Sequence, residues 1–475
     1  MQVWCNKQSI FKTQLLMKKI TLFLLLAALA FNPVHAQKKI FNETPEQKAK
    51  RVKWWTDARF GMFIHWGTYS LAARHEWVKH NERMTDSVYQ KYFDNFNPDE
   101  FDPKKWAKEA KAAGMKYAVL TTKHHEGFCL FDSKYTNYKA TNTQAHRDLV
   151  KEFVDAFRSE GIKVGFYYSL LDWHYPDYTI DDAHPQRAPD NYTDEQKAAY
   201  YAKVNKGRDM NKYRQYLKNQ VTELLTNYGK IDILWLDWTW DKGAKYGKHP
   251  QDWDAVNLIK LVRKLQPGII VNNRLGLDQD GYTDGGDFVT PEQVKPAELL
   301  KYKGKYWETC QTFSGSWGYY RDETTWKNQR QLLDLLVTSA ANGGNLILNV
   351  GPTARGEFDY RATKALDSLA YWMHENNLSI YNCTYPPDEY NIPESMNDRL
   401  TYNPKTKKLY LHLFNYPEDG QLTLPGYNGK IKYAQFLNDD SEVPFTVAEN
   451  GSDLILKLPK NAPPYVVPVI EMMVK

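Results

Sequence analysis

The sequence predicts an α/β fold, a (β/α)8-like barrel of the TIM type, followed by a C-terminal antiparallel β-sandwich. From about residue 50 to 375, short apolar stretches alternate with amphipathic ones, which is typical of a parallel sheet covered by helices. Beyond about residue 385 the pattern changes to short alternating stretches separated by turn residues. A chain of 475 residues is long enough for both parts.

Seven apolar stretches are predicted as strands of the barrel. They cover residues 61–66, 117–122, 163–169, 232–238, 268–273, 305–310 and 344–350. Seven such strands favour a barrel with an irregular eighth element. A doubly wound open sheet is the alternative, but no glycine-rich phosphate loop follows the first strand, which weakens it.

Helices are predicted between these strands, for example over residues 101–114, 147–161 and 325–341. The first two end in Gly114 and Gly161, and glycine is the usual residue just past a helix C-terminus. Strands of the sandwich are expected at residues 409–415, 421–427, 431–438, 453–459 and 466–474. We therefore assign residues 37–380 to the barrel and 381–475 to the sandwich.

The N-terminus has the pattern of a secretory signal peptide, which we place at residues 1–36, with an upstream start before Met17. Lys18 and Lys19 precede a short apolar run and a small residue, Ala36, at the expected cut. The run is too short for a membrane span. The expected location is the periplasm, with release to the outside as the alternative.

Charge and cysteine content exclude several classes of partner. Cleavage after Ala36 removes four lysines and no acidic residue, so the net charge falls from +5 to +1. A nearly neutral chain gives no reason to expect nucleic acid or an anionic membrane as a partner. The remaining cysteines, Cys129, Cys310 and Cys383, are scattered and predict neither a disulfide framework nor a metal site.

Polar and ionisable residues gather where the predicted strands end, and that is the face on which barrel enzymes build their sites. Asp237 is the most telling, because it stands among Trp235, Trp238 and Trp240, where a carboxylate is costly to desolvate unless it has a function. The alternative for Asp237 is the N-cap of the next helix. The other residues at strand ends are His65, Trp66, Lys123, His124, His125, Glu126, Tyr167, Tyr168 and Arg274. Glu292 lies in the loop beyond Arg274, Glu308 lies on the sixth strand, and Asn345 and Asn349 flank the seventh.

The chemistry that these residues favour is glycoside hydrolysis without a metal or cofactor. His124 and His125 are neighbours on a strand and would point to opposite faces, so hydrogen bonding to hydroxyls is a better reading than joint metal binding. A secreted, aromatic-rich barrel with two carboxylates suits glycosidase chemistry, in which one attacks or activates water and the other protonates the leaving oxygen. Asp237 takes one role, with Glu292 or Glu308 for the other and Glu76 and Glu126 as less favoured candidates.

At the level of motifs, the chain resembles the α-L-fucosidases of glycoside hydrolase family 29, in a secreted bacterial form. The resemblance runs from about residue 45 to 475, with the motifs in the family's order. They are GMFIHWGTYS, HEW, KHHEGFCLFDSKYT, GFYYS, LWLDW, VNNR, DFVTPE, WETC, SWGY and GGNLILNVGP.

The resemblance implies a retaining exo-α-L-fucosidase that acts through a covalent fucosyl-enzyme. By motif, Asp237 would be the nucleophile and Glu292 the acid/base, with Glu308 as runner-up. The fucose-binding residues that it implies are His65, Glu76, Trp77, His124, His125, Tyr167, Trp235 and Arg274. The expected partner is a fucosylated glycan.

Two alternatives stay open at this level: an exo-glycosidase for another sugar, such as galactose, and a catalytically inactive carbohydrate-binding protein. Two long polar segments, 172–208 and 275–287, depart from simple expectation. We expect the first to cover part of the cleft. The second segment precedes Glu292, and its length makes the match of Glu292 to the motif position of the family less direct.

Overall fold

The computed structural model describes residues 38–475, so the predicted signal peptide, residues 1–36, lies outside the described residues. Its centre is a curled sheet of seven parallel strands in the order β5-β4-β3-β2-β1-β7-β6. The strands are β1 Phe60–Ile64, β2 Tyr117–Lys123, β3 Lys163–Ser169, β4 Ile233–Asp237, β5 Ile270–Val271, β6 Glu308–Thr312 and β7 Asn345–Val350. Each predicted strand overlaps an observed one, and the predicted fold class is confirmed.

The missing eighth position is filled by an irregular segment, residues 287–293. Its backbone bridges β5 on one side, at Asn272 and Phe288, and β6 on the other, at Glu292 and Cys310. The amide of Val289 donates to Tyr306 at 3.0 Å, and the amide of Glu308 donates to Val289 at 3.0 Å. Because this closing segment joins both edges, it completes the ring and carries Glu292 at a fixed place on its rim.

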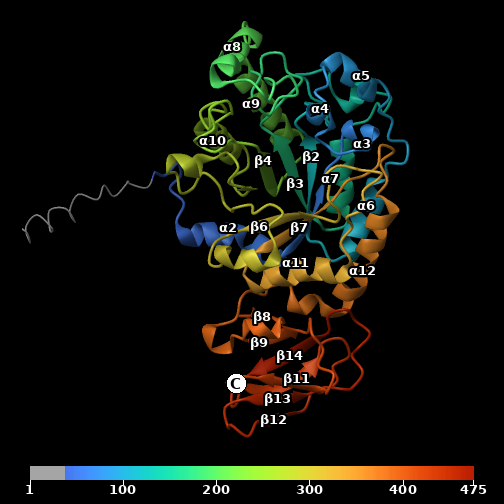
Figure 1. Ribbon diagram of the computed structural model, residues 1–475, viewed down its shortest axis with the longest axis vertical. Helices are drawn as coiled ribbons and strands as arrows, with labels where there is room; N and C mark the ends of the chain where they lie inside the picture. The colour runs from blue at the N-terminus through green and yellow to red at the C-terminus, as the bar shows by residue number, and fades with distance from the viewer. Residues whose placement is uncertain (1–37) are drawn as a thin grey trace, which may run out of the picture.

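Helices surround the sheet (Figure 1). They are α2 Pro45–Ala58, α3 Tyr69–Ala72, α4 Val78–Asn81, α5 Asp86–Asp94, α6 Pro103–Ala112, α7 Leu149–Ser159, α8 Asp194–Val204, α9 Met210–Asn227, α10 Ala255–Leu265, α11 Gln329–Ala341 and α12 Tyr360–Asn376. Gly114 and Gly161 follow α6 and α7 with φ of 85° and 76°, the left-handed conformation that glycine adopts at helix ends. The last predicted helix begins at Gln329, not at residue 325, because Asn328 caps it by accepting from the amide of Gln331.

The inside of the barrel is filled by side chains that alternate along the strands. Phe63, Val119, Tyr167, Trp235 and Ile347 form one buried cluster there. Helix α2 contributes Trp55 to the same cluster, so this helix covers the end of the barrel at which the strands begin. The opposite end, where the strands finish, is left for the site.

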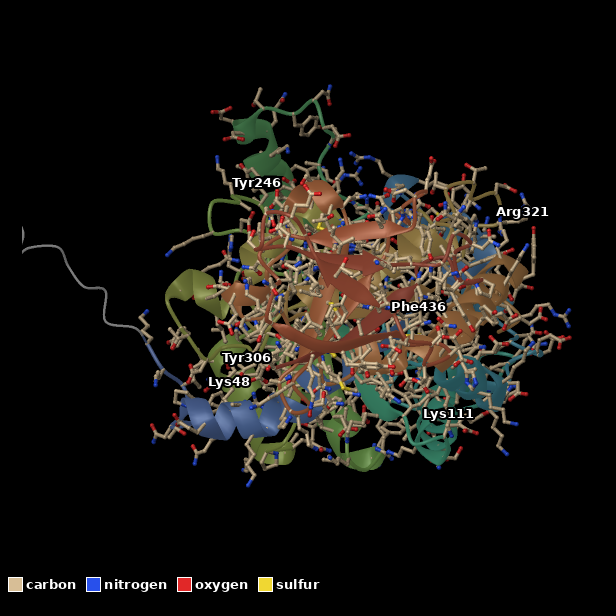
Figure 2. The ribbon with its side chains drawn as sticks, turned by 90° about the horizontal axis from the view of Figure 1, so that it is seen from below. Lys48, Lys111, Tyr246, Tyr306, Arg321 and Phe436 are labelled. Atoms are coloured by element: carbon tan, nitrogen blue, oxygen red, sulfur yellow. The ribbon has the colours of Figure 1, made fainter. Side chains whose placement is uncertain are left out.

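The C-terminal part has its own core in two antiparallel sheets, ordered β10-β13-β12 and β11-β14-β9-β8. Its strands are β8 Arg399–Asn403, β9 Lys408–His412, β10 Gln421–Leu424, β11 Ile431–Phe436, β12 Phe445–Val447, β13 Leu454–Lys457 and β14 Val469–Val474. Figure 1 shows α11 and α12 between these sheets and the barrel, and Figure 2, seen from below, shows Phe436 of β11 in front of the barrel.

Strands β8 and β12 were not predicted, since β8 alternates weakly and β12 has only three residues. The predicted boundary at residues 380 and 381 falls in the connection between α12 and β8.

The closing segment is fastened to the body of the barrel by a buried ion cluster. Asp287, 6% exposed, accepts from Arg51 at 2.7 Å and from Arg263 at 2.5 Å, and also from the amide of Val271 at 2.8 Å. Burial alone would raise the pKa of Asp287, but Arg51 and Arg263 together hold it below its ordinary value. The carboxylate is therefore ionised and pairs with two arginines at the start of the segment, one of which, Arg51, also pairs with Glu43.

We expect Asp287→Ala to destabilise the fold by about 3–5 kcal/mol, because it leaves Arg263 without its carboxylate partner and Arg51 with Glu43 alone. Chemical denaturation measures the change. Asp322→Ala is the matched control, since Asp322 pairs with Arg321 on the surface and its loss should cost less than about 1 kcal/mol. Equal effects of the two substitutions would contradict the role given to the cluster.

Candidate active site

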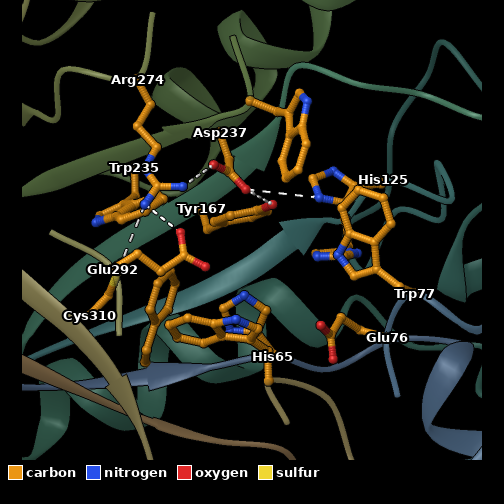
Figure 3. Close-up of a pocket in the computed structure, with 14 residues that line it drawn as sticks. His65, Glu76, Trp77, His125, Tyr167, Trp235, Asp237, Arg274, Glu292 and Cys310 are labelled. Atoms are coloured by element: carbon orange, nitrogen blue, oxygen red, sulfur yellow. Dashed lines mark hydrogen bonds and ion pairs between the residues drawn. The ribbon is translucent and has the colours of Figure 1, made fainter. Parts of the chain in front are cut away.

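A pocket of about 360 Å³ opens where the barrel strands end (Figure 3). Most of the residues that line it are predicted as site residues from the sequence. The lining residues are Phe63, His65, Glu76, Trp77, His124, His125, Tyr167, Trp235, Asp237, Trp238, Arg274, Glu292, Cys310 and Trp317. All predicted site residues line this pocket except Glu308, which lies deeper in the barrel.

Asp237 is the last residue of β4 and is 8% exposed. Its carboxylate accepts from the Tyr167 hydroxyl at 2.7 Å and from Arg274 Nη1 at 2.9 Å, and His125 Nε2 lies 3.9 Å away. The alternative of a helix N-cap is wrong, because the next helix, α10, begins at residue 255 and has Asp254 at its N-cap position. These contacts hold Asp237 in place with its charge balanced by Arg274.

Glu292 stands on the closing segment, with 41% of its side chain exposed, and accepts from Arg274 Nη2 at 2.6 Å. Arg274 therefore binds one carboxylate with each of its two terminal nitrogens, as the dashed lines of Figure 3 show. Burial would lower the pKa of Arg274, but Asp237 and Glu292 raise it well above its ordinary value. The guanidinium also lies over the Trp235 ring, 4.7 Å from its centroid.

Two of the pocket histidines have their tautomer set by the residues behind them. Asn349 donates its amide to the carbonyl of Trp317 at 2.7 Å, so its oxygen faces His65 Nδ1 at 2.6 Å. A nitrogen that meets an amide oxygen must donate, so His65 carries its proton on Nδ1. Burial keeps the pKa of His65 well below its usual value, so the ring is neutral and its Nε2 is an acceptor.

The tautomer of His125 is set in the same way, here by a serine. Ser169 donates its only hydroxyl proton to the carbonyl of Leu171 at 2.9 Å and meets His125 Nδ1 at 2.6 Å. The serine oxygen must therefore accept from Nδ1–H. Burial lowers the pKa of His125 as well, which leaves a neutral ring with Nε2 as an acceptor.

His124 and His125 follow the end of β2, and both side chains reach the pocket, with ring centroids 4.1 Å apart. Behind them, His124 Nδ1 lies 3.4 Å from a carboxylate oxygen of Glu126, which does not line the pocket. Glu76 is buried and accepts from the amide of Gly318 at 2.8 Å. Glu76 thereby joins the HEW motif to the SWGY motif, more than 200 residues apart in the chain.

Glu308 is fully buried at the first position of β6, at the end of the barrel that α2 covers. It accepts from the Tyr117 hydroxyl at 2.5 Å, from Trp55 Nε1 at 3.2 Å and from Trp235 Nε1 at 3.4 Å. Burial raises the pKa of its carboxyl group to about 7, against the effect of these three donors. Glu308 therefore supports Trp235 from below and does not reach the pocket.

Sequence reasoning did not assign a role to four lining residues, Phe63, Trp238, Cys310 and Trp317. Trp238 and Trp317 belong to motifs that were recognised, so their positions carried a signal. Phe63 and Cys310 also belong to such motifs, GMFIHWGTYS and WETC, but as apolar residues within predicted strands they look like ordinary core residues. Asn349 and Ser169, which set the histidine tautomers, act from outside the pocket wall. Asn349 flanks the seventh predicted strand, which is a signal in the sequence, whereas only its hydrogen bonds reveal the role of Ser169.

Within residues 38–475, no group of three or more potential ligands is arranged to hold a metal ion. The free cysteines, Cys129, Cys310 and Cys383, are all buried. No helix in this range has both the length and the apolar character needed to cross a membrane.

A barrel of this kind, with two carboxylates on one arginine and an aromatic wall, defines a glycoside hydrolase. Comparison with known proteins gives the family. Residues 28–378 match the family model described as alpha-L-fucosidase, and the chain belongs to this family, glycoside hydrolase family 29.

Individual relatives agree with this assignment. The chain is 28% identical to the Dictyostelium discoideum alpha-L-fucosidase over 95% of its own length and 98% of that protein. It is 29% identical to human tissue alpha-L-fucosidase over 78% of this chain and 77% of that one. Among solved structures, alpha-L-fucosidase isoenzyme 1 of Paenibacillus thiaminolyticus superposes with a TM-score of 0.80 at 42% identity, covering 90% of this chain and 99% of that one.

We expect the buried Glu308 to make stability depend on pH. Its pKa is near 4.5 in an unfolded chain and about 7 in the fold, so the folded chain holds the extra proton between these values. Stability from this group is therefore complete below about pH 4.5 and is lost as pH rises to 7, by about 3 kcal/mol at most.

Glu308→Gln should remove this dependence, so its melting temperature should rise relative to the wild type as the pH goes from 4.5 to 7.5. Glu298→Gln, at a surface ion pair with Lys301, is the control and should show no such trend. A constant difference between Glu308→Gln and the wild type across the window would contradict the buried, proton-holding state.

Proposed function

We propose that this protein removes terminal α-L-fucose from glycans with retention of configuration, with Asp237 as nucleophile and Glu292 as acid/base. One observation carries the proposal: Arg274 bonds both carboxylates, so both face the same small pocket. Asp237 is almost enclosed, with 11% of its side chain exposed, while Glu292 is open to solvent on the rim. A nucleophile inside and an acid at the mouth suit a sugar that enters by its non-reducing end.

In the first step, a carboxylate oxygen of Asp237 attacks the anomeric carbon and the glycosidic C–O bond breaks. The leaving oxygen takes the proton of Glu292, which gives a fucosyl ester on Asp237 and a free alcohol. In the second step, Glu292 takes a proton from water, the water oxygen attacks the anomeric carbon, and the ester bond to Asp237 breaks. Two inversions give net retention.

A related structure supports the covalent route. A Bacteroides thetaiotaomicron alpha-L-fucosidase, 28% identical to this chain with a TM-score of 0.73, was trapped as a covalent intermediate with 2-fluoro-fucosyl fluoride in a variant with glutamate replaced by glutamine. That replacement is consistent with a glutamate serving the second step.

The choice of Glu292 over Glu308 rests on position. An acid/base must reach the leaving oxygen, either directly or through one water. Glu292 lines the pocket and is exposed, whereas Glu308 lies under Trp235 and is fully buried. If a raised pKa were the only criterion for the acid/base, Glu308 would be the better candidate. Its carboxyl group is buried and does not line the pocket, so it does not reach the substrate.

Sugar recognition follows from the chemistry of the wall. His65 and His125 present Nε2 lone pairs, so each accepts from a sugar hydroxyl, while Arg274 donates. Phe63, Trp235 and Trp317 give an apolar surface that suits the C5 methyl group of fucose. A site that hydrogen-bonds a sugar hydroxyl strongly rejects a sugar that lacks this hydroxyl. An apolar site that only packs against the sugar discriminates much less.

We infer as well that residues 1–36 direct export to the periplasm or beyond, on the basis of their basic, apolar and small-residue order. N-terminal sequencing of the protein purified from its host tests this inference. A first residue of Gln37 would support it, and an intact N-terminus in the cytoplasm would contradict it.

We expect Asp237→Ala to lower hydrolysis of an aryl α-L-fucoside by on the order of 10⁴-fold or more, since no group replaces the nucleophile. Added azide should restore turnover and give β-fucosyl azide, because azide attacks from the side of the missing carboxylate. Glu292→Ala should lose about 10²–10⁴-fold on a poor leaving group and much less on a good one. Glu308→Gln should keep the wild-type dependence on the leaving group.

The wild type itself decides between the alternatives. No release of fucose from any fucoside, together with release of galactose, would support a glycosidase for another sugar. Sugar binding without turnover would support a binding protein. A dead Glu308→Gln with an active Glu292→Ala would reverse the assignment of the acid/base.

The histidine tautomers give a second expectation, tested with deoxy and deoxyfluoro fucosides. Fluorine accepts hydrogen bonds weakly and cannot donate. If His65 and His125 accept from hydroxyls, replacing those hydroxyls with fluorine should impair binding to the free enzyme as much as replacing them with hydrogen. Clearly better binding of the fluoro analogue, measured by competitive inhibition, would mean that the imidazoles donate instead.

A further inference from the structure

The three pocket histidines differ in the group that stands behind each of them. His65 Nδ1 meets an amide oxygen and His125 Nδ1 meets a hydroxyl oxygen, and both of these groups are neutral. His124 Nδ1 faces a carboxylate instead, with Glu126 Oε2 at 3.4 Å. Both side chains are buried, and neither of these two atoms has a hydrogen-bond partner elsewhere in residues 38–475. The protons of this pair therefore decide what His124 offers to the pocket.

A tight turn places Glu126 behind His124. The amide of Gly127 donates to the carbonyl of His124 at 3.1 Å, and Gly127 has φ of 86°. A β-carbon at Gly127 would lie 2.4 Å from a carboxylate oxygen of Asp172, so only glycine fits this position of the turn. On the other side, a β-carbon at Gly67 would lie 3.0 Å from Glu126 Oε1. The turn therefore holds the carboxylate and the imidazole in one closely packed site.

The charge of Glu126 must be balanced inside this site. Among residues 38–475, its one ion-pair partner is His124. Lys123, the cation nearest to it in the sequence, is fully buried and pairs with Asp172 at 2.9 Å. A carboxylate ion beside a neutral imidazole would leave a buried, uncompensated negative charge, which is very costly. The pair is without net charge only if it holds two protons in all.

We propose that Glu126 is a positioning residue that makes His124 a hydrogen-bond donor to the sugar, opposite in sense to His65 and His125. One of the two protons lies between Nδ1 and the carboxylate, and the other is on Nε2. This is true both for an imidazolium beside a carboxylate and for a neutral imidazole beside a carboxyl group. Because Nδ1 is turned to Glu126 and the ring lines the pocket, Nε2–H is the group that meets a ligand.

The position of His124 suits a donor. Its ring centroid lies 4.1 Å from that of His125 and 5.7 Å from that of His65, so it stands beside both acceptors. Sugar hydroxyl groups have a proton to give and lone pairs to fill. A third acceptor here would compete with the first two for hydroxyl protons, whereas a donor lets this part of the wall bind hydroxyls in both senses. That the sugar is fucose rests on the proposed function.

Nitrogen NMR of the full chain with isotope-labelled histidine tests the ring protons directly. A ring nitrogen that carries a proton differs strongly in chemical shift from one that does not, and His124→Gln identifies the signals of His124 by removing them. Near neutral pH we expect a proton on Nε2 of His124 and none on Nε2 of His65 or His125. Added L-fucose should leave this proton in place and move its signal downfield. A bare Nε2 on His124 would overturn the proposal.

Substitutions of Glu126 test its own part, with the dissociation constant of L-fucose measured by calorimetry. Glu126→Leu keeps a side chain of similar size but leaves His124 Nδ1 without a partner, and we expect this constant to rise about tenfold. Glu126→Gln can place an amide N–H against Nδ1, where the shared proton lies, so it should bind L-fucose within about threefold of the wild type. If the leucine and glutamine variants bind equally well, Glu126 only fills space and the positioning role is wrong.

Glu223→Leu is the matched control. Glu223 is a buried glutamate of α9 that accepts from the hydroxyl of Ser133 at 2.8 Å and from the amide of Lys134 at 2.9 Å, and it does not line the pocket. Its loss should lower the melting temperature but change the dissociation constant of L-fucose by less than about twofold. An equal loss of binding in Glu223→Leu and Glu126→Leu would point to general damage and overturn the positioning role.

The failure of this proposal and that of the proposed function are distinguishable, because the ring protons are observed without a ligand. A wild type that neither binds L-fucose nor hydrolyses any fucoside contradicts the proposed function. A wild type that hydrolyses an aryl α-L-fucoside, but has a bare Nε2 on His124, overturns the donor role alone.

Discussion

The site depends on one guanidinium group that serves two carboxylates. Arg274 follows β5, the shortest strand of the sheet, and reaches across to Asp237 on β4 and Glu292 on the closing segment. The guanidinium places one positive charge between two carboxylates that face the same small pocket, and this charge offsets their repulsion.

Behind this pair, the barrel fixes each group through residues that never touch the sugar. Asn349 and Ser169 set the protons of two histidines, Glu308 supports Trp235, and Asp287 anchors the closing segment. The two histidine contacts join neighbouring strands, whereas Glu308 on β6 reaches Trp235 on β4 and Asp287 pairs with arginines of α2 and α10. The precision of the pocket is therefore a property of the whole ring of strands.

The sequence was sufficient to predict the order of the strands along the chain and the position of Asp237 near the end of one of them, because apolar strands ending in polar residues leave a clear pattern. It favoured Glu292 over Glu308 as the acid/base by motif alone. The strand expected at residues 305–310 is observed at 308–312, which places Glu308 at the beginning of the strand, far from the rim. Glu292 lies on an irregular segment with almost no strand pattern, and its position depends on contacts with both sheet edges. The weak alternation of β8 and the brevity of β12 hid those strands for a similar reason.

The ion cluster of Asp287 also bears on the order in which the molecule takes shape. Arg51 lies 236 residues before Asp287, and β1 pairs with β7 from the far end of the barrel. Contacts between such distant parts of a chain carry a large loop-closure entropy and form late in folding. The closing segment bridges to both edges of the sheet, so it can take its place in the ring only when both edges are present. Recovery of activity during refolding should thus lag behind recovery of helix and sheet, and would report the completed barrel instead of its first assembled strands.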